Sequence, residues 1–362
     1  MCGIIGIISE EDVSSSIYES LTVIQHRGQD AAGMATLEDG KLHVRKQIGL
    51  VREVFRAQHI KNLKGKMGIG HVRYPTAGGV TREFSQPLYV NSPYGISICH
   101  NGNLVNSKEL TQELYENDLR HLNTDSDSEV ILNIFANEMQ KINSQSPSPE
   151  EIFSAVEKMH LRLKGAYSVV LMISGVGLLA IRDPNGIRPL MMGKKENDLL
   201  GKTDYMFASE SPALDALDFE ILGDLKPAEA VFVSLEGKMS RKICHNSPQH
   251  SPCIFEYVYL ARPDAVIEEI SVLKSRLRMG QKLGKKINSI YPNSKIDAVI
   301  PIPESSTSSA IEVAKYLGVN YREGFVKNRY IGRTFIMPKQ DMRRKSVRRK
   351  LNPIPFEFKD KN

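Results

Sequence analysis

The sequence has few cysteines and no long apolar run, and each absence excludes a class of protein. Only four cysteines occur in 362 residues, at Cys2, Cys99, Cys244 and Cys253. They make no disulfide framework and no CxxC metal-binding pair. No apolar run approaches the roughly 18 to 20 residues that cross a bilayer, and the N-terminus lacks the basic-then-apolar layout of a signal peptide. We therefore expect a cytoplasmic protein that needs no membrane.

Acidic and basic residues are divided unevenly along the chain. Residues 1–240 contain 24 Lys and Arg against 31 Asp and Glu, a net charge of −7, whereas residues 241–362 contain 24 against 11, a net charge of +13. A basic half favours an anionic partner, either nucleic acid or a phosphorylated small molecule. The most basic run, 343–350, lacks the interleaved aromatic side chains of a base-stacking surface. We therefore expect a phosphorylated small molecule and no nucleic acid.

Length and periodicity predict two domains with a boundary near residue 240. A chain of 362 residues exceeds what one hydrophobic core usually serves. The first part is rich in short strands bounded by Gly, Asn, Asp or Pro, with helices between blocks of strands, which predicts two sheets covered by helix layers. The expected strands are 3–9, 31–37, 41–47, 68–74, 96–100, 166–174, 177–182, 205–209 and 230–234, and the expected helices are 11–25, 128–142 and 149–163.

The second part of the chain has a different pattern. A long basic amphipathic helix is predicted over 271–290, and the apolar run 296–300 is typical of a buried parallel strand. The polar loop 301–309 and a helix over 310–317 follow. A strand, a polar loop and a helix start form the layout in which backbone N–H groups at a helix N-terminus bind phosphate.

Cys2 directly follows Met1, a position that suits an N-terminal nucleophile. If Met1 is removed, as is usual before a small residue, one residue carries both a thiol and a free α-amino group. An α-amino group has an ordinary pKa of about 7.7 to 8, so it can serve as a general base at neutral pH. The alternative is that Cys2 is a small residue at the start of a buried strand.

Four polar segments of the first part supply further groups for such a reaction, each expected where a strand enters a loop. Asn101 and Gly102 offer a side-chain amide and an unencumbered backbone N–H to an oxyanion. Arg73 suits a carboxylate and Asp127 an ammonium group, the two charges of a free amino acid. Taken singly, Asn-Gly is a common turn, and the two charges are ordinary surface residues. The segments are 25–30, 70–79, 100–104 and 123–129.

Together these segments resemble the class II, N-terminal-nucleophile glutamine amidotransferases. The resemblance implies a four-layer αββα, α+β N-terminal-nucleophile hydrolase domain over residues 1–240. It also implies the first part of an α/β type I phosphoribosyltransferase domain over 241–362. We therefore expect ammonia from glutamine to pass to phosphoribosylpyrophosphate, giving phosphoribosylamine, pyrophosphate and glutamate at the start of purine synthesis. The matching segments are 25–33, 70–78, 100–104, 123–130, 182–190, 255–264 and 324–338.

The resemblance implies a role for each candidate residue of the first domain. Cys2 attacks the side-chain amide of glutamine, and Asn101 and Gly102 stabilise the oxyanion. His26 and His71 are structural neighbours of the site, because a cysteine that carries its own amine needs no histidine base. The glutamine-binding residues are Arg27, Arg73, Thr76 and Asp127.

In the second domain the resemblance implies a phosphoribosylpyrophosphate site. Ser305 stands where the family usually has Thr in the pyrophosphate loop, and it is the one ligand that we assign to Mg²⁺. The chain stops before the acidic loop with which the family binds the ribose, the 5′-phosphate and the magnesium-bound diphosphate. We therefore expect a C-terminally truncated chain that hydrolyses glutamine weakly and makes little or no phosphoribosylamine. The residues that contact phosphoribosylpyrophosphate are Ser305, Ser306, Lys327, Arg329 and Arg333.

Two alternatives stay open. One is another class II amidotransferase, such as a glucosamine-6-phosphate or asparagine synthase, although neither acceptor domain resembles 296–317 or 324–338. The other is an inactive truncated remnant. Family members are commonly homotetramers, and some carry a propeptide and an iron–sulfur cluster. We expect no propeptide, since Cys2 follows Met1, and no cluster, although Cys253 lies near a cluster-ligand region of those relatives.

Overall fold

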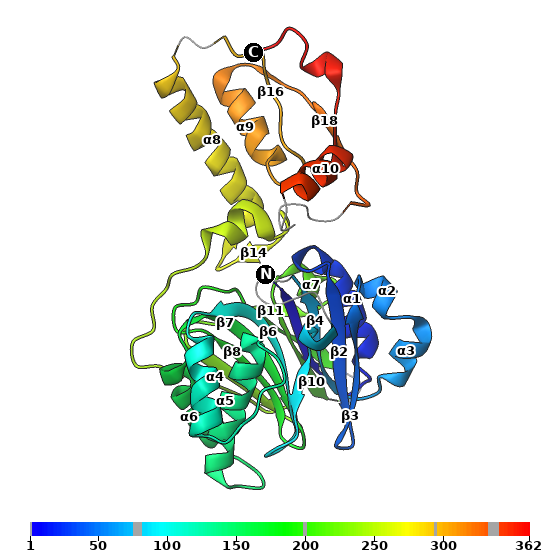
Figure 1. The fold of residues 1–362 in the computed structure, drawn as a ribbon, viewed down its shortest axis with the longest axis vertical. Helices are drawn as coiled ribbons and strands as arrows, with labels where there is room; N and C mark the ends of the chain where they lie inside the picture. Colours follow the sequence, from blue (N-terminus) through cyan, green and yellow to red (C-terminus); the bar gives the residue numbers. More distant parts are fainter. Residues whose placement is uncertain (1, 75–81, 198–200, 293–294, 332–339) are drawn as a thin grey trace. The chain divides into compact units, whose positions relative to one another are not determined.

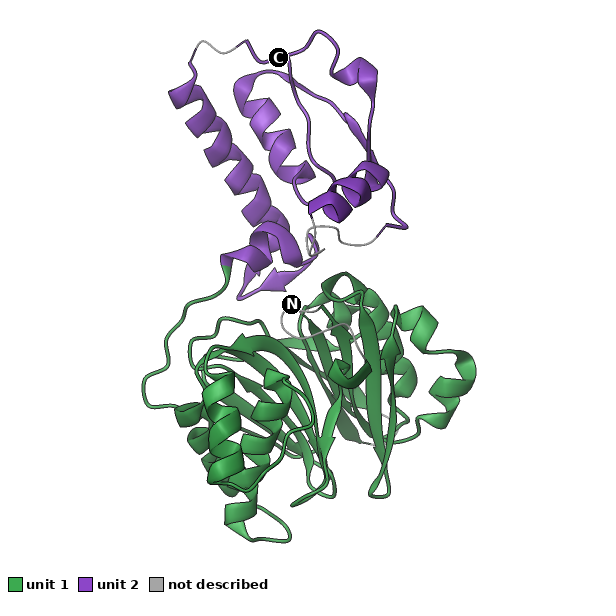
Figure 2. Cartoon of the chain, in the orientation of Figure 1, with its two compact units in different colours: residues 1–253 green, residues 254–362 purple. Residues whose placement is uncertain are grey.

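The computed structural model describes residues 2–74, 82–197, 201–292, 295–331 and 340–362. It divides into two compact units, residues 1–253 and 254–362 (Figure 2). The boundary expected near residue 240 falls inside strand β13 (Met239–Ile243), which pairs with β12 (Glu229–Ser234) in the first unit. Within the described ranges, no helix is long and apolar enough to cross a membrane.

Two antiparallel sheets form the centre of the first unit (Figure 1). The seven-stranded sheet has the order β11 (Glu220–Asp224), β9 (Met191–Asn197), β10 (Lys202–Ala208), β1 (Gly3–Ile8), β4 (Met67–Arg73), β2 (Ala31–Glu38) and β3 (Lys41–Ile48). The six-stranded sheet has the order β13, β12, β8 (Gly177–Arg182), β7 (Gly165–Ile173), β6 (Ile96–Leu104) and β5 (Leu88–Val90).

Alternating side chains place each sheet between two apolar layers. Ile5 and Ile7 of β1 pack with the helix side of the seven-stranded sheet, whereas Ile4 and Ile8 join the core between the sheets. This alternation follows from the two-residue period of a strand. A third core lies between the six-stranded sheet and its helices. The expected four-layer αββα architecture is therefore confirmed.

Helices cover the outer faces of both sheets (Figure 1). Ser148 and Glu151 form a capping box that starts α6, as the sequence predicts. Helix α5 begins at Asp127, where the N-cap Ser126 accepts a hydrogen bond from the Ser128 nitrogen. The helices are α1 (Ser14–Val23), α2 (Val51–Val54), α3 (Ala57–Asn62), α4 (Ser107–Glu116), α5 (Asp127–Ile142), α6 (Pro149–Arg162) and α7 (Pro212–Asp215), with short turns η1 (Gln25–Arg27) and η2 (Arg82–Phe84).

One element differs from its prediction at a position that matters for the site. Strand β6 does not end at His100 but continues to Leu104. Asn101 and Gly102 therefore lie inside a strand, opposite Ser168 and Tyr167 of β7. The prediction of a strand end or turn there was wrong, because pairing along all of β7 outweighs the local turn preference of Asn-Gly.

The second unit contains the predicted long helix and a parallel strand pair. Helix α8 (Val272–Ile290) starts at the N-cap Ser271 and packs on α9 (Thr307–Leu317). Strand β16 (Ala298–Val299) pairs in parallel with β17 (Asn320–Tyr321), but both its residues are only half-buried. The expectation of a buried strand was therefore wrong. The other elements are η3 (Glu256–Leu260), β14 (Val266–Ile267), β15 (Ile270–Ser271), β18 (Phe325–Lys327), α10 (Gln340–Lys350), β19 (Leu351–Pro353) and η4 (Pro355–Glu357).

Candidate active site

Cys2 is held on both sides of its α-carbon. Its backbone nitrogen donates to Oδ1 of Asn101 at 3.0 Å, and its carbonyl oxygen accepts from Nε of Arg27 at 3.0 Å. Its Sγ lies 3.5 Å from the nitrogen and 3.6 Å from the carbonyl oxygen of Tyr74. Only 9% of the residue is exposed. The main chain of Cys2 therefore has a defined orientation, and its thiol lies against the end of β4.

Strand register and one glycine bring these partners together. Gly3 pairs with Val72, so the end of β4 lies beside Cys2. Gly28 follows the turn that carries Arg27, and a Cβ on it would overlap the backbone of Val72. Only glycine allows this close approach. The turn can therefore place the Arg27 guanidinium next to Cys2.

Asn101 combines a used acceptor with an unused donor. The residue is fully buried, and while its Oδ1 accepts from Cys2, its Nδ2 has no hydrogen-bond partner among the described residues. A buried amide donor without an acceptor is costly. An oxygen that gains negative charge next to Cys2 would satisfy it.

Gly102 lies beside Asn101 where the strand has no space for a side chain. A Cβ there would overlap the carbonyl oxygen of Ala166 and lie 2.7 Å from Nε2 of His100 and from the Cα of Tyr167. The position therefore requires glycine for steric reasons, in addition to any role of its backbone N–H.

Arg73 is the last residue of β4, and Asp127 is the first residue of α5. Arg73 is 6% exposed and holds its guanidinium carbon 5.3 Å from the centre of the Phe84 ring. Burial lowers the pKa of Arg73, and the nearby acidic groups of Cys2, Asp30 and Asp127 partly offset this effect. The two candidate substrate-binding charges therefore lie close enough to interact.

A buried hydrogen-bond network connects the strand of Asn101 to the helix of Asp127. Gln86 accepts from the His100 nitrogen at 2.6 Å and donates to Oγ of Ser128 at 2.8 Å. Nδ1 of His100 lies 2.9 Å from that same oxygen. Asp127 also accepts from the Leu104 nitrogen at 3.0 Å. The network fixes β6 relative to the start of α5.

The two nearby histidines contact other polar groups of the site. Nε2 of His71 lies 3.2 Å from the carbonyl oxygen of His100, and burial lowers the pKa of His71 to about 3, so its ring is neutral. Burial also lowers the pKa of His100. Nε2 of His26 lies 2.8 Å from Oε1 of Glu210.

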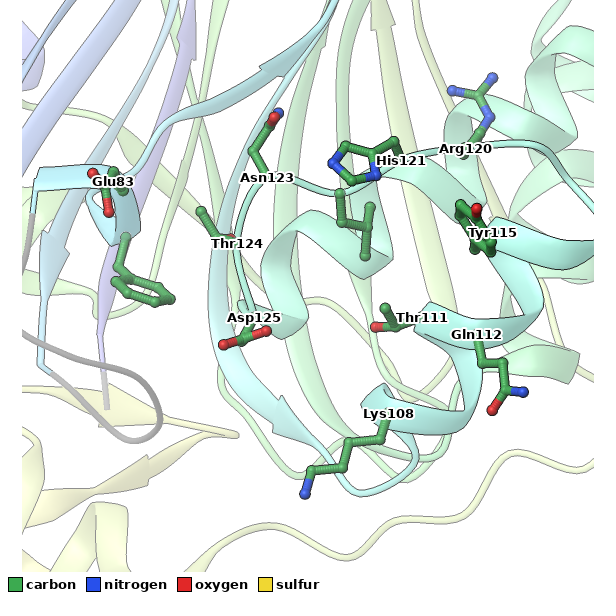
Figure 3. Close-up of a pocket in the computed structure, with 12 residues that line it drawn as sticks. Glu83, Lys108, Thr111, Gln112, Tyr115, Arg120, His121, Asn123, Thr124 and Asp125 are labelled. Carbon is green, nitrogen blue, oxygen red and sulfur yellow. The ribbon is translucent and has the colours of Figure 1, made fainter.

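A separate pocket of about 610 Å³ is lined in part by the Asn123–Asp125 loop (Figure 3). Figure 3 shows helix α4 with Lys108 and Tyr115 bordering it, and Glu83 at its opposite end. Neither Cys2 nor Asn101, both within the described ranges, lines this pocket. It borders the site through Phe84, the residue that lies under Arg73. The candidate residues Cys2 and Asn101 therefore lie outside this pocket.

The candidate residues of the second unit are partly brought together. Ser305 and Ser306 form the turn before α9, and Oγ of Ser306 donates to the Ile302 carbonyl oxygen at 2.6 Å. Nζ of Lys327 lies 3.4 Å and Nε of Arg329 lies 3.9 Å from the carboxylate of Glu304. Thr76 and Arg333 lie outside the described residues.

The described residues do not fit a Mg²⁺ site. They contain no group of three or more His, Cys, Asp or Glu side chains that could hold a metal ion. Mg²⁺ binds through carboxylates and phosphates, and the hydroxyl of Ser305 alone does not provide this set.

The sequence did not point to three residues that support the site. Glu210 binds His26 and Arg27, Gln86 binds His100 and Ser128, and Ser209 accepts from the Ile4 nitrogen at 2.9 Å. These contacts span up to 205 residues of sequence, and no local spacing indicates them.

Comparison with known proteins first shows the class of protein to which this chain is similar. A family model described as a glutamine amidotransferase domain matches residues 79–216, which include Asn101, Gly102 and Asp127. Relatives named amidophosphoribosyltransferase from Pseudomonas aeruginosa, Escherichia coli K12 and Saccharomyces cerevisiae are 55%, 53% and 48% identical, each over 100% of this chain and 72% of the relative. The chain belongs to the amidophosphoribosyltransferase family.

Solved structures agree with this assignment. One is a glutamine phosphoribosylpyrophosphate amidotransferase from B. subtilis complexed with ADP and GMP, with a TM-score of 0.79 at 34% identity over 98% of this chain and 72% of that chain. Another is described as the allosteric regulatory enzyme of purine biosynthesis, with a TM-score of 0.81 at 35% identity over 98% of this chain and 71% of that chain. The expected family is therefore confirmed.

Proposed function

We propose that this chain hydrolyses glutamine at Cys2 and supplies the ammonia for phosphoribosylamine formation from phosphoribosylpyrophosphate. One observation supports the glutaminase step above all. Asn101 holds the Cys2 nitrogen with its side-chain oxygen, and its buried Nδ2 donor has no hydrogen-bond partner among the residues that the structure describes. Membership of the amidophosphoribosyltransferase family supports phosphoribosylpyrophosphate as the acceptor of the ammonia.

The proposed reaction uses Cys2 as both nucleophile and base. Once Met1 is removed, the free α-amino group takes the thiol proton, and the thiolate attacks the side-chain carbonyl carbon of glutamine. The negative charge that develops on the oxygen is stabilised by Nδ2 of Asn101 and the N–H of Gly102. The α-ammonium group then protonates the leaving nitrogen, ammonia departs, and water hydrolyses the resulting thioester to glutamate.

Asn101 has a second role in this proposal. Its Oδ1 accepts a hydrogen bond from one N–H of the α-amino group, just as it accepts a hydrogen bond from the Cys2 nitrogen at 3.0 Å in the structure. This contact turns the amine so that its lone pair faces the thiol of the same residue. One side chain therefore aligns the base and stabilises the oxyanion.

We assign glutamine binding to Arg73 for the α-carboxylate and Asp127 for the α-ammonium group, since hydrogen bonds between oppositely charged groups are stronger than those between neutral groups. Thr76 remains a predicted glutamine contact. We assign Arg27 to Cys2 and not to glutamine, because its Nε and Nη1 bind the Cys2 carbonyl and Glu210, and only 1% of the residue is exposed.

We assign the glutaminase activity to the first unit, residues 1–253, and phosphoribosylpyrophosphate binding to the second unit, residues 254–362. Mg²⁺ is the metal expected with phosphoribosylpyrophosphate. A homotetramer, a cytoplasmic location and a lack of iron–sulfur cluster stay predictions. The proposed phosphoribosylpyrophosphate contacts are Ser305, Ser306, Lys327, Arg329 and Arg333.

Glutamate release from glutamine tests the proposal. The purified chain is expected to release glutamate, and Cys2→Ser is expected to lose this activity with an unchanged thermal melt. Glutamate release that persists in Cys2→Ser would refute the role of Cys2. Pyrophosphate release from phosphoribosylpyrophosphate, assayed with glutamine and separately with ammonium chloride, measures the acceptor step independently.

A further inference from the structure

We propose that Glu210 is a positioning residue for the nucleophile, acting through Arg27 on the main chain of Cys2. The inference rests on the proposed glutaminase function. Glu210 lies between β10 and α7 and is fully buried. Its Oε1 accepts from Nη1 of Arg27 at 2.5 Å, and Nε of the same guanidinium donates to the Cys2 carbonyl oxygen at 3.0 Å.

The geometry of a guanidinium makes this connection stiff. Nε and Nη1 belong to one rigid plane, so a contact that fixes Nη1 also fixes the direction in which Nε donates. Arg27 is 1% exposed. A buried guanidinium needs a buried counter-charge, since removal of one partner leaves the other charge uncompensated. The carboxylate of Glu210 therefore sets where Arg27 holds Cys2.

The segment that carries Glu210 supports the nucleophile strand at a second point. Oγ of Ser209 accepts from the Ile4 nitrogen at 2.9 Å, and the Ser209 nitrogen donates to the Ile4 carbonyl oxygen at 3.1 Å. Asn101 fixes the nitrogen of Cys2. The backbone of Cys2 is therefore fixed from both sides, and rotation about the Cα–Cβ bond remains as the main freedom of the thiol.

His26 provides a matched control for this chain of contacts. Its Nε2 lies 2.8 Å from the same Oε1 of Glu210, and its side chain is 29% exposed. This contact involves the same carboxylate, but it does not connect Glu210 to Cys2, because Arg27 takes no part in it. If Glu210 acts through Arg27, loss of the His26 contact has little effect on the reaction.

The first test compares Glu210→Gln with His26→Ala in the full chain. Glu210→Gln is expected to lower kcat for glutamate release about 10- to 100-fold, because small misplacements of a reacting group have effects of this size. Its KM for glutamine is expected to stay within about twofold, because Glu210 holds the nucleophile and not the substrate. His26→Ala removes the contact with Glu210 and is expected to keep kcat within about threefold.

The second test removes both buried charges together. Arg27→Gln combined with Glu210→Gln removes both charges of this pair, so it is expected to melt closer to the unaltered chain than either single variant. Its kcat is expected to equal that of Arg27→Gln alone, because residues that act through one chain of contacts are not additive. If Glu210→Gln fails to fold, the double variant still tests whether the contact between Glu210 and Arg27 affects kcat.

Three results would overturn the inference. One is an unchanged kcat in Glu210→Gln, and another is a KM that rises as much as kcat falls. The third is a folded double variant that retains the kcat of the unaltered chain. Failure of the proposed function would appear separately, as a lack of glutamate release from the unaltered chain.

Discussion

Asn101 reaches Cys2 from the opposite sheet of the sandwich. Cys2 precedes β1 of the seven-stranded sheet, Asn101 lies in β6 of the six-stranded sheet, and 3.0 Å separates the Cys2 nitrogen from Oδ1 of Asn101. The candidate site therefore forms only when the two sheets pack at their correct spacing. This dependence links the stability of the sandwich core to the geometry of the nucleophile.

Substitution of Asn101 separates its two proposed roles. Asn101→Asp keeps an acceptor for the Cys2 nitrogen but removes the Nδ2 donor, so kcat for glutamate release is expected to fall about 10²- to 10³-fold. Asn101→Ala removes both contacts and is expected to lower kcat further. The exposed neighbour Asn103 supplies the control, since Asn103→Asp is expected to retain kcat. An active Asn101→Asp variant would argue against the oxyanion role.

Gly102→Ala is expected to separate β6 from β7. The added methyl group would overlap the carbonyl oxygen of Ala166 and crowd Nε2 of His100, and such overpacking costs about 1 to 3 kcal/mol. We expect a lower melting temperature and a loss of glutamate release larger than the stability change explains. A variant with unaltered kcat would show that β6 adjusts without moving Asn101.

Asp127→Asn tests the proposed ammonium contact. Hydrogen bonds to charged groups contribute about 1.5 to 3 kcal/mol, so KM for glutamine is expected to rise about 10- to 100-fold, with a smaller change in kcat. Asp125→Asn removes an exposed carboxylate two residues earlier and is expected to leave KM unaltered. A fall in kcat at unchanged KM would instead place Asp127 in the chemical step.

Acid stability is expected to depend on the buried histidines. Burial lowers the pKa of His160 to about 3 in the folded chain, whereas an unfolded histidine titrates near 6.5. The unfolded state therefore binds more protons than the folded state between these two pH values. The contribution of His160 to the free energy of unfolding is fully present above pH 6.5 and declines by about 1.4 kcal/mol per pH unit below it.

His160→Gln removes this titration. Between pH 7 and pH 5, the free energy of unfolding of the unaltered chain is expected to fall about 2 kcal/mol more than that of the variant. Urea unfolding at both pH values measures the difference. His121→Gln, at an exposed position, is the control, and an equal decline in all three proteins would contradict the expectation.

The sequence predicted those parts of the molecule that depend on local pattern or on family motifs. The capping box at Ser148 and the four-layer architecture belong to this group. The end of β6 was mispredicted because pairing with β7 outweighs the turn preference of Asn-Gly. Gln86 and Glu210 could not be found, because their contacts join segments far apart in the sequence.

The central claim is most directly tested by the intact mass of the chain after incubation with 6-diazo-5-oxo-norleucine, a glutamine analogue that alkylates the nucleophile. Burial raises the pKa of Cys99 and raises that of Cys244 to about 12, so neither thiol is expected to react. The account predicts one adduct on a chain that lacks Met1, located at Cys2 and absent from Cys2→Ser. A folded chain without Met1 that gains no adduct, or gains it at another residue, would contradict the account.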